Sequence, residues 1–342
     1  MRIVVFSLID DWELGSLLTE RGHELLAWVR PAWETENRRP LTPGIRKAVK
    51  LLLSLDQPSR NVIPKFDIRE WLQQTGTPRI SCKNVNEPAF IDSLRQMRVD
   101  MAIVGAYRQI FKPVLLEVPR LGVINYHPSL LPRYAGPQPA FWALRNGEKE
   151  TGITIHRMTE GIDAGDILIQ EVVPVSEGEN VGQLIQRLHH RSASLIVQTV
   201  EAISAGSMKG HPQNVSERTY FGKKKVSDTI INWNESTLSL MNLLRAVRPF
   251  EPLKAGLRGR SVNIFEARPA SAERIGRPGE IVQRKGNHLV VQTGERCLEI
   301  TKYEIEPFHG WVNRLAQQFL PVVGDRFDLS AGESEKPLPE AL

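Results

Sequence analysis

The sequence predicts an α/β fold, in which a mostly parallel sheet with helices on both faces is followed by a small β-barrel. Short apolar runs and segments of helical spacing alternate along the first half of the chain, a rhythm typical of parallel sheets. From Thr229 onward, short strands separated by turn residues predict an antiparallel barrel. The 342 residues are enough for two domains of ordinary size.

The first half supplies the elements of the predicted sheet. Strands are expected at residues 2–8, 24–29, 100–107, 121–127, 151–158 and 167–176. Helices are expected at residues 12–22, 67–76, 89–97, 139–148 and 181–205. In sheets of this kind ligands bind outside the carboxyl ends of the strands, so polar side chains at those ends are candidates for a site.

The second half supplies a helix and the strands of the predicted barrel. The helix is expected at residues 236–247. Strands are expected at residues 261–267, within 279–306 and at 324–329. Glycine-centred segments at 285–287 and 293–295 predict hairpin turns, and a closed barrel is the natural form for about five short strands.

The change of pattern predicts domain boundaries. The predicted parts are an N-terminal sheet domain, a linker, a barrel domain and a disordered tail, at residues 1–206, 207–228, 229–329 and 330–342. The segment 30–64 fits neither pattern and is long for a loop in a compact domain, and such loops are usually functional or disordered.

Composition indicates a soluble chain of a reducing cytoplasm. The two cysteines, Cys82 and Cys297, lie far apart without metal-ligand spacing, which argues against a disulfide scaffold and a structural zinc site. No apolar run is long enough to cross a membrane, and the N-terminus reads as a strand instead of a signal peptide. The net charge of +5 permits a polyanionic partner without demanding one.

Two hydrogen-bonding side chains stand at the end of the strand at 121–127. Asn125 and His127 are two residues apart in "GVINYHPSLLPRYAG", so they project from the same face of the strand. An amide and an imidazole together can hold a carbonyl oxygen and stabilise the negative charge that grows on it in a tetrahedral intermediate. A structural pair at a strand end is the alternative interpretation.

A carboxylate that could orient the imidazole follows in "MTEGIDAGDI". Asp163 lies in a glycine-flanked turn between two predicted strands, and Glu160 and Asp166 are neighbours that could take the same role. Turn chemistry alone is the other explanation for an aspartate at such a position.

The motifs "INYHPSLLPRYAGPQP" and "TGITIHRMTEGIDAGDIL" together resemble the catalytic domain of folate-dependent formyltransferases over roughly residues 1–205. This family includes methionyl-tRNA formyltransferase, glycinamide ribonucleotide transformylase, amino-sugar N-formyltransferases and formyltetrahydrofolate deformylase. The segment "IINWNESTLSLMNLLRAVRPF" resembles the entry into the C-terminal OB-like barrel of some members. The resemblance implies a Rossmann-like formyltransferase fold followed by an OB-like domain.

The resemblance also implies the chemistry. A primary amine would attack the formyl carbon of 10-formyltetrahydrofolate directly; Asn125 would hold the formyl oxygen, His127 would stabilise the oxyanion, and Asp163 would pair with His127. No metal is implied. The residues implied to line the folate site are Tyr107, Ile110, Phe111, Ser129, Leu130, Met158, Thr159, Gly161 and Ile162. For Ile110 and Phe111, ordinary core packing is the alternative.

Two classes of acceptor amine are open. Residues 30–50 carry six basic and two acidic residues, and residues 245–285 carry ten basic and four acidic residues, which suits initiator tRNA. Arg38, Arg39 and Arg133 are the predicted acceptor-binding residues. The first strand running into "SLIDDWELG", the "YAGPQPAFW" segment and extra residues near 53–65 depart from the tRNA enzymes and favour a small amine, such as an amino sugar or an amino-acid derivative.

Functions of other classes remain as alternatives. A hydrolase of formyltetrahydrofolate would share Asn125, His127 and Asp163, although we expect no separate regulatory domain ahead of the sheet domain. A non-catalytic RNA-binding protein would keep the basic patches and lose the catalytic residues. A nicotinamide enzyme would need a G-x-G-x-x-G turn after the first strand, which the sequence lacks.

Overall fold

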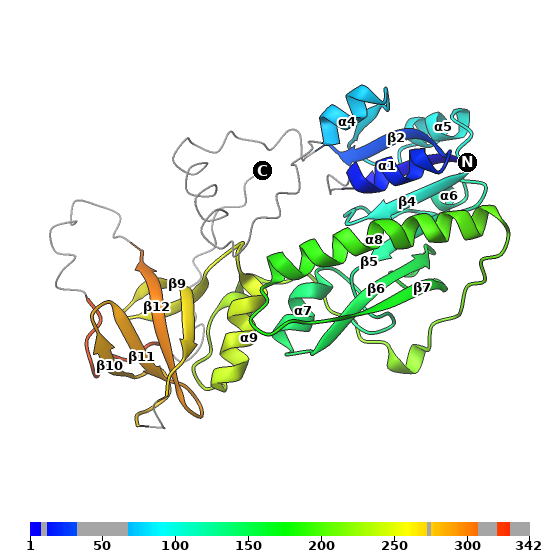
Figure 1. Cartoon of the computed structure of the whole chain (residues 1–342). Helices are drawn as coiled ribbons and strands as arrows, with labels where there is room; N and C mark the ends of the chain where they lie inside the picture. Colours follow the sequence, from blue (N-terminus) through cyan, green and yellow to red (C-terminus); the bar gives the residue numbers. More distant parts are fainter. Residues whose placement is uncertain (8–11, 33–67, 272–274, 307–319, 329–342) are drawn as a thin grey trace. The chain divides into compact units, whose positions relative to one another are not determined.

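The computed structural model describes residues 1–7, 12–32, 68–271, 275–306 and 320–328 (Figure 1). Arg38, Arg39 and the predicted tail lie outside the described residues, as does most of the segment 30–64. Within the described part of the chain, no helix is long and apolar enough to cross a membrane.

A seven-stranded sheet forms the first half, in the order β3-β2-β1-β4-β5-β6-β7. Its strands are β1 (Arg2–Ser7), β2 (Glu24–Pro31), β3 (Arg79–Cys82), β4 (Met101–Gly105), β5 (Val123–His127), β6 (Glu150–Arg157) and β7 (Ile167–Pro174). The strands β1 to β5 pair in parallel, whereas β6 runs antiparallel to β5. The prediction of a mostly parallel sheet is confirmed.

Helices accompany the sheet strands along the chain (Figure 1). They are α1 (Trp12–Glu20), α4 (Ile68–Gln74), α5 (Pro88–Gln96), α6 (Pro113–Leu116), α7 (Pro139–Arg145) and α8 (Val181–Ser204). The long amphipathic helix expected at 181–205 is therefore confirmed. The sequence prediction did not include α6 or β3, because four residues are too few to show a period.

The alternation of side chains gives the sheet two buried faces. Val4 and Phe6 of β1 pack with Ile91 and Leu94 of α5 in one apolar cluster. Val5 and Ser7 alternate with these two residues along β1, so they point to the other face, where they line a small cavity together with Ile196 of α8. In β5, Val123 belongs to the α5 side, so Asn125 and His127, at i+2 and i+4, leave the sheet on that side.

The C-terminal part is a five-stranded antiparallel sheet in the order β10-β11-β12-β9-β8. It follows α9 (Thr237–Val247), whose N-cap Ser236 accepts a hydrogen bond from the backbone N–H of Ser239. The strands are β8 (Leu253–Leu257), β9 (Arg260–Pro269), β10 (Ile281–Lys285), β11 (His288–Gln292) and β12 (Cys297–Ile305). Both predicted glycine hairpins are present, between β10 and β11 and between β11 and β12.

The segment predicted as a strand at 324–329 makes isolated bridges instead, and that prediction is wrong. Phe327 bridges Leu257 of β8, and Arg326 bridges Glu280 just before β10. Since β8 and β10 are the two edges of the sheet, this short segment ties both edges together, as barrel closure requires. The backbone of this segment bonds to two different partners, since the N–H of Phe327 donates to the carbonyl of Gly279 and the N–H of Asp328 donates to that of Gly256.

Internal contacts divide the chain into two compact units. The first holds residues 1–132, 153–171 and 189–217, and the second holds residues 133–152, 172–188 and 218–342. Two segments of the sheet half, residues 133–152 and 172–188, therefore belong to the second unit. The domain boundaries predicted at 206 and 229 stay a prediction.

Candidate active site

Asn125 and His127 lie at the carboxyl end of β5, in the first compact unit. His127 is buried and Asn125 is half-buried. The antiparallel partner β6 places His156 opposite Asn125 and Thr154 opposite His127, so these four side chains share one face of the sheet. The shared face predicted for Asn125 and His127 carries two polar neighbours from β6.

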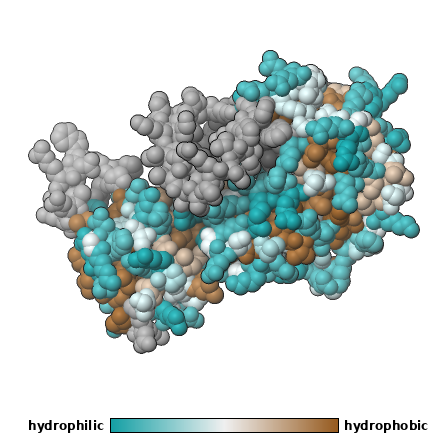
Figure 2. All heavy atoms as spheres, in the orientation of Figure 1, coloured by the Kyte–Doolittle hydropathy of each residue, from teal (hydrophilic) through white to brown (hydrophobic). Residues whose placement is uncertain are grey.

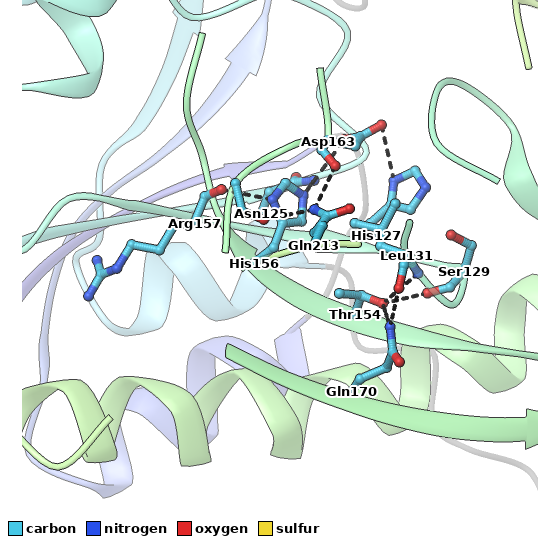
Figure 3. Close-up of polar contacts among 11 residues, drawn as sticks. Asn125, His127, Ser129, Leu131, Thr154, His156, Arg157, Asp163, Gln170 and Gln213 are labelled. Carbon is cyan, nitrogen blue, oxygen red and sulfur yellow. Dashed lines mark hydrogen bonds and ion pairs between the residues drawn. The ribbon is translucent and has the colours of Figure 1, made fainter. Parts of the chain in front are cut away.

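The turn between β6 and β7 brings Asp163 to this face (Figure 3). Asp163 Oδ2 lies 3.7 Å from His127 Nδ1, and its side chain is 15% exposed. Its backbone is left-handed, with φ of 48°, a conformation that aspartate tolerates better than most residues. The carboxylate can therefore stabilise an imidazolium at His127.

The two competing carboxylates stay outside this arrangement. Glu160 and Asp166 are exposed, whereas Asp163 is largely covered. The backbone carbonyl of Asp166 accepts a hydrogen bond from the N–H of Arg157, which holds the base of the turn. Among the three acidic residues of the turn, Asp163 is the one that contacts His127.

His156 is a site residue that the sequence reasoning missed. It is 2% exposed, its Nε2 lies 3.0 Å from Asn125 Nδ2 and 3.7 Å from Asp163 Oδ1. Its Nδ1 lies 2.8 Å from the carbonyl oxygen of Arg157, so Nδ1–H donates there, and in the neutral ring Nε2 accepts from the Asn125 amide. This bond fixes the amide orientation and leaves the second N–H of Asn125 for a ligand oxygen.

The sequence indicated only that His156 lies in a predicted strand. His156 follows Thr154 at i+2 in "TGITIHRM", which shows that the two share a face but not which strand they oppose. The register Asn125 to His156 is a property of the assembled sheet.

The loop after β5 is held by Thr154. Its hydroxyl donates to the carbonyl of Ser129 at 2.6 Å and accepts from the N–H of Leu131 at 3.2 Å. Gln170 Nε2 donates to both Thr154 Oγ1 and the carbonyl of Leu131, at 2.8 and 2.9 Å. Because Thr154 is fully buried, these bonds fix the loop next to His127.

The predicted folate-lining residues of the segment after β4 have different surroundings. Phe111 is buried in the core, edge-on to Phe6 with ring centres 4.9 Å apart. Tyr107 packs edge-on to both rings, and burial raises the pKa of its hydroxyl. Ile110 is 66% exposed, and its carbonyl accepts from Asn86 Nδ2.

The other predicted folate residues come from the loop after β5 and from the turn of Asp163. Ser129 is fully buried, Leu130 is half-buried, and Met158 packs against the α5-side core. Thr159, Gly161 and Ile162 are exposed on the turn. The turn therefore offers apolar surface and backbone groups beside Asp163.

Arg133, one of the three predicted acceptor-binding residues, lies in the second compact unit and makes an ion pair. Its guanidinium contacts Glu148 Oε1 at 2.6 Å and lies over the ring of Tyr134. The hydroxyl of Tyr134 donates to the same carboxylate oxygen at 2.6 Å. Arg38 and Arg39 lie outside the described residues.

The geometry can stabilise an oxyanion and move one proton. Asn125 offers a fixed N–H, and the buried His127 is paired with a carboxylate, so both can act on a carbonyl oxygen above the strand end. Among the described residues, no group of three or more His, Cys, Asp or Glu side chains could hold a metal ion.

The sequence matches domain families along most of its length. Residues 53–200 match the family described as formyl transferase, and residues 223–308 match the formyl transferase C-terminal domain. Together these segments cover more than half of the chain.

Curated relatives and solved structures agree with this match. The chain is 35% identical to a methionyl-tRNA formyltransferase of Syntrophus aciditrophicus, over 67% of this chain and 73% of the relative. It is 30% identical to that of Geobacter metallireducens, over 93% and 94%. Its fold is similar to the sugar 3N-formyl transferase WlaRD, solved with dTDP and 5-N-formyl-THF, with a TM-score of 0.60 at 15% identity over 91% of this chain and 98% of that chain.

Proposed function

This chain belongs to the formyl transferase family and is a folate-dependent N-formyltransferase, and we propose that Asn125, His127 and Asp163 are its catalytic residues. The co-substrate is 10-formyltetrahydrofolate. The observation that carries the proposal is the convergence of the three side chains. The carboxylate of Asp163 lies 3.7 Å from the buried His127, which shares a strand face with Asn125.

The proposed reaction is a direct attack on the formyl carbon. The amine nitrogen forms a bond to that carbon, and the negative charge on the formyl oxygen is stabilised by the Asn125 N–H and by His127. His127, with Asp163, moves the proton released by the amine, and N10 of the folate takes up a proton as its bond to carbon breaks. No covalent enzyme intermediate is needed.

The folate would lie beside the turn of Asp163. Its pterin ring would contact exposed groups of the turn and the segment after β4. The proposed folate-binding residues are Tyr107, Ile110, Phe111, Ser129, Leu130, Met158, Thr159, Gly161 and Ile162. Phe111 would act by supporting Tyr107, because its own side chain is enclosed by the core.

The acceptor that we propose first is the methionyl group of initiator tRNA. Similarity to methionyl-tRNA formyltransferases extends through both halves of the chain, and residues 245–285 carry ten basic against four acidic residues. Such a surface suits phosphates. Arg38, Arg39 and Arg133 would then contact the tRNA.

A small amine is the second candidate acceptor, and the departure of the "YAGPQP" segment from the pattern of the tRNA enzymes favours it. In the "YAGPQP" segment, Tyr134 stacks on Phe221 with ring centres 5.1 Å apart, and Gln138 is left-handed with φ of 60°. This segment has a fixed shape of its own at the place where the sequence departs from the tRNA enzymes.

A formylation assay with 10-formyltetrahydrofolate tests both acceptors. Charged initiator tRNA is compared with a panel of amino sugars and amino-acid derivatives, each with wild type and the His127→Ala variant. Transfer to either set that disappears in the variant supports the catalytic assignment. Release of formate without transfer to any acceptor would favour the hydrolase alternative.

A further inference from the structure

After the end of α8, the chain returns to the turn between β6 and β7 that holds Asp163. His211 and Ile167 form an antiparallel bridge, with N–H to carbonyl distances of 2.9 and 2.8 Å. Gly210 lies so close to Asp166 that a Cβ there would come within 2.8 Å of the Asp166 Cβ. The two backbone hydrogen bonds of this bridge hold the segment against the start of β7.

Two residues later, Gln213 reaches into the turn of Asp163 (Figure 3). Its Nε2 donates to the carbonyl of Asp163 at 2.8 Å and to the carbonyl of Gly165 at 2.7 Å. A primary amide has two N–H donors, and both are used on carbonyls of the same turn.

The backbone of the turn has an uncommon conformation that the two hydrogen bonds from Gln213 stabilise. Asp163 is left-handed, and this backbone state is unfavourable for a residue with a Cβ. Gly165 is enclosed, since a Cβ at that position would lie 2.0 Å from the carbonyl oxygen of Arg157. The carbonyls on either side of this kink converge on one point, and the Gln213 amide occupies it.

The orientation of the Gln213 amide is set by this contact. Its Oε1 is buried and has no hydrogen-bond partner among the described residues. Leaving a buried acceptor without a partner costs about 1–3 kcal/mol. A flipped amide would instead place Oε1 against two carbonyl oxygens, so the two bonds to the turn decide which way the amide lies.

We propose that Gln213 is the positioning residue for Asp163: by binding the carbonyls of residues 163 and 165, it keeps the carboxylate between His127 and His156. Each carboxylate oxygen lies 3.7 Å from one imidazole, so a small shift of the turn changes both contacts. This inference rests on the proposed function, because it requires Asp163 to act in formyl transfer.

The Gln213→Glu variant tests the inference, because it keeps the shape of the side chain and removes both donors. The expected result is a fall in kcat of about tenfold, with the KM for the folate within about threefold of wild type. Gln198→Glu is the matched control, since Gln198 is exposed on α8 and the charge change is the same; its kinetics should equal wild type. Gln213→Ala gives the same comparison if the glutamate variant does not fold.

A double-mutant cycle separates positioning from a merely structural role. If Gln213 acts through Asp163, adding Gln213→Glu to Asp163→Asn lowers kcat by less than about twofold further. Multiplication of the two single effects overturns the inference, as does a kcat of Gln213→Glu equal to wild type. Full activity of Asp163→Asn would instead overturn the proposed function, whatever Gln213→Glu does.

Discussion

His127 and His189 lie against opposite faces of the sheet, and their surroundings differ. On the α5 side, His127 lies 3.7 Å from the carboxylate of Asp163. On the α8 side, His189 of α8 packs against Tyr126, the residue of β5 next to His127, with ring centres 5.3 Å apart. Burial lowers the pKa of His189 to about 4. Burial alone keeps a histidine neutral, whereas an adjacent carboxylate lets a buried histidine carry charge.

The difference continues in the residues around each histidine. His127 is surrounded by hydrogen-bonded side chains, the Thr154 hydroxyl among them. His189 borders a cavity of about 20 Å³ that Ser7 and Ser192 also line, which is room for about one water molecule. An adjacent carboxylate is therefore the feature that distinguishes His127, the proposed catalytic residue, from His189.

The largest expected effect tests this contrast directly. His127→Ala, Asn125→Ala and Asp163→Ala should each lower kcat by about a hundredfold or more, because each removes an oxyanion or proton-transfer group. His189→Gln should retain kcat within about twofold. A formylation assay with the preferred acceptor measures both. Equal losses from His127→Ala and His189→Gln would break the comparison.

The second effect concerns the stability of the loop beside His127. Thr154→Val keeps the side-chain volume but removes the hydroxyl shared by Ser129, Leu131 and Gln170, and we expect a loss of about 2 kcal/mol in the free energy of unfolding. Urea unfolding measures it. Thr75→Val, at an exposed threonine just after α4 whose hydroxyl donates to the carbonyl of Trp71, is a control that should cost less. An unchanged midpoint for Thr154→Val would contradict the role of this hydroxyl.

The third effect concerns His156, which lies on the same face of the sheet as His127. His156→Ala frees the Asn125 amide to rotate, and we expect kcat to fall about tenfold. If His156 acts through its hydrogen bond with Asn125, the double variant with Asn125→Ala should be little worse than Asn125→Ala alone. Steady-state kinetics of the four proteins decide this, and additive losses would assign His156 a separate contact with substrate.

The smallest effect lies on the α8 side and concerns pH. The pKa of His189 is about 4 in the folded state against 6.5 as its ordinary value, so the unfolded chain binds the proton more readily. The stability that neutral His189 contributes is present above pH 6.5 and is lost as pH falls toward 4. We expect the free energy of unfolding to fall by about 1 kcal/mol between pH 7.5 and 5.5 because of this group. Unfolding of wild type and His189→Gln at both pH values measures the difference. The same pH dependence in both proteins would contradict it.

Local pattern was sufficient for the main part of the fold. The alternation of apolar and helical runs predicted the parallel sheet, and the glycine hairpins predicted the antiparallel sheet after Thr229. Prediction failed where an element is short or unusually paired. β8 was not recognised, and the segment at 326–327 bridges two sheet edges instead of forming a strand.

The sequence by itself determined which chemistry stands at the end of β5, because i and i+2 spacing places Asn125 and His127 on one face in any strand. It also placed Asp163 in a glycine-flanked turn. Only the tertiary structure decided that His156 lies opposite Asn125 and that Gln213 binds the turn of Asp163. The physical reason is that strand register and the return of a distant segment depend on long-range packing, which leaves no local spacing in the chain.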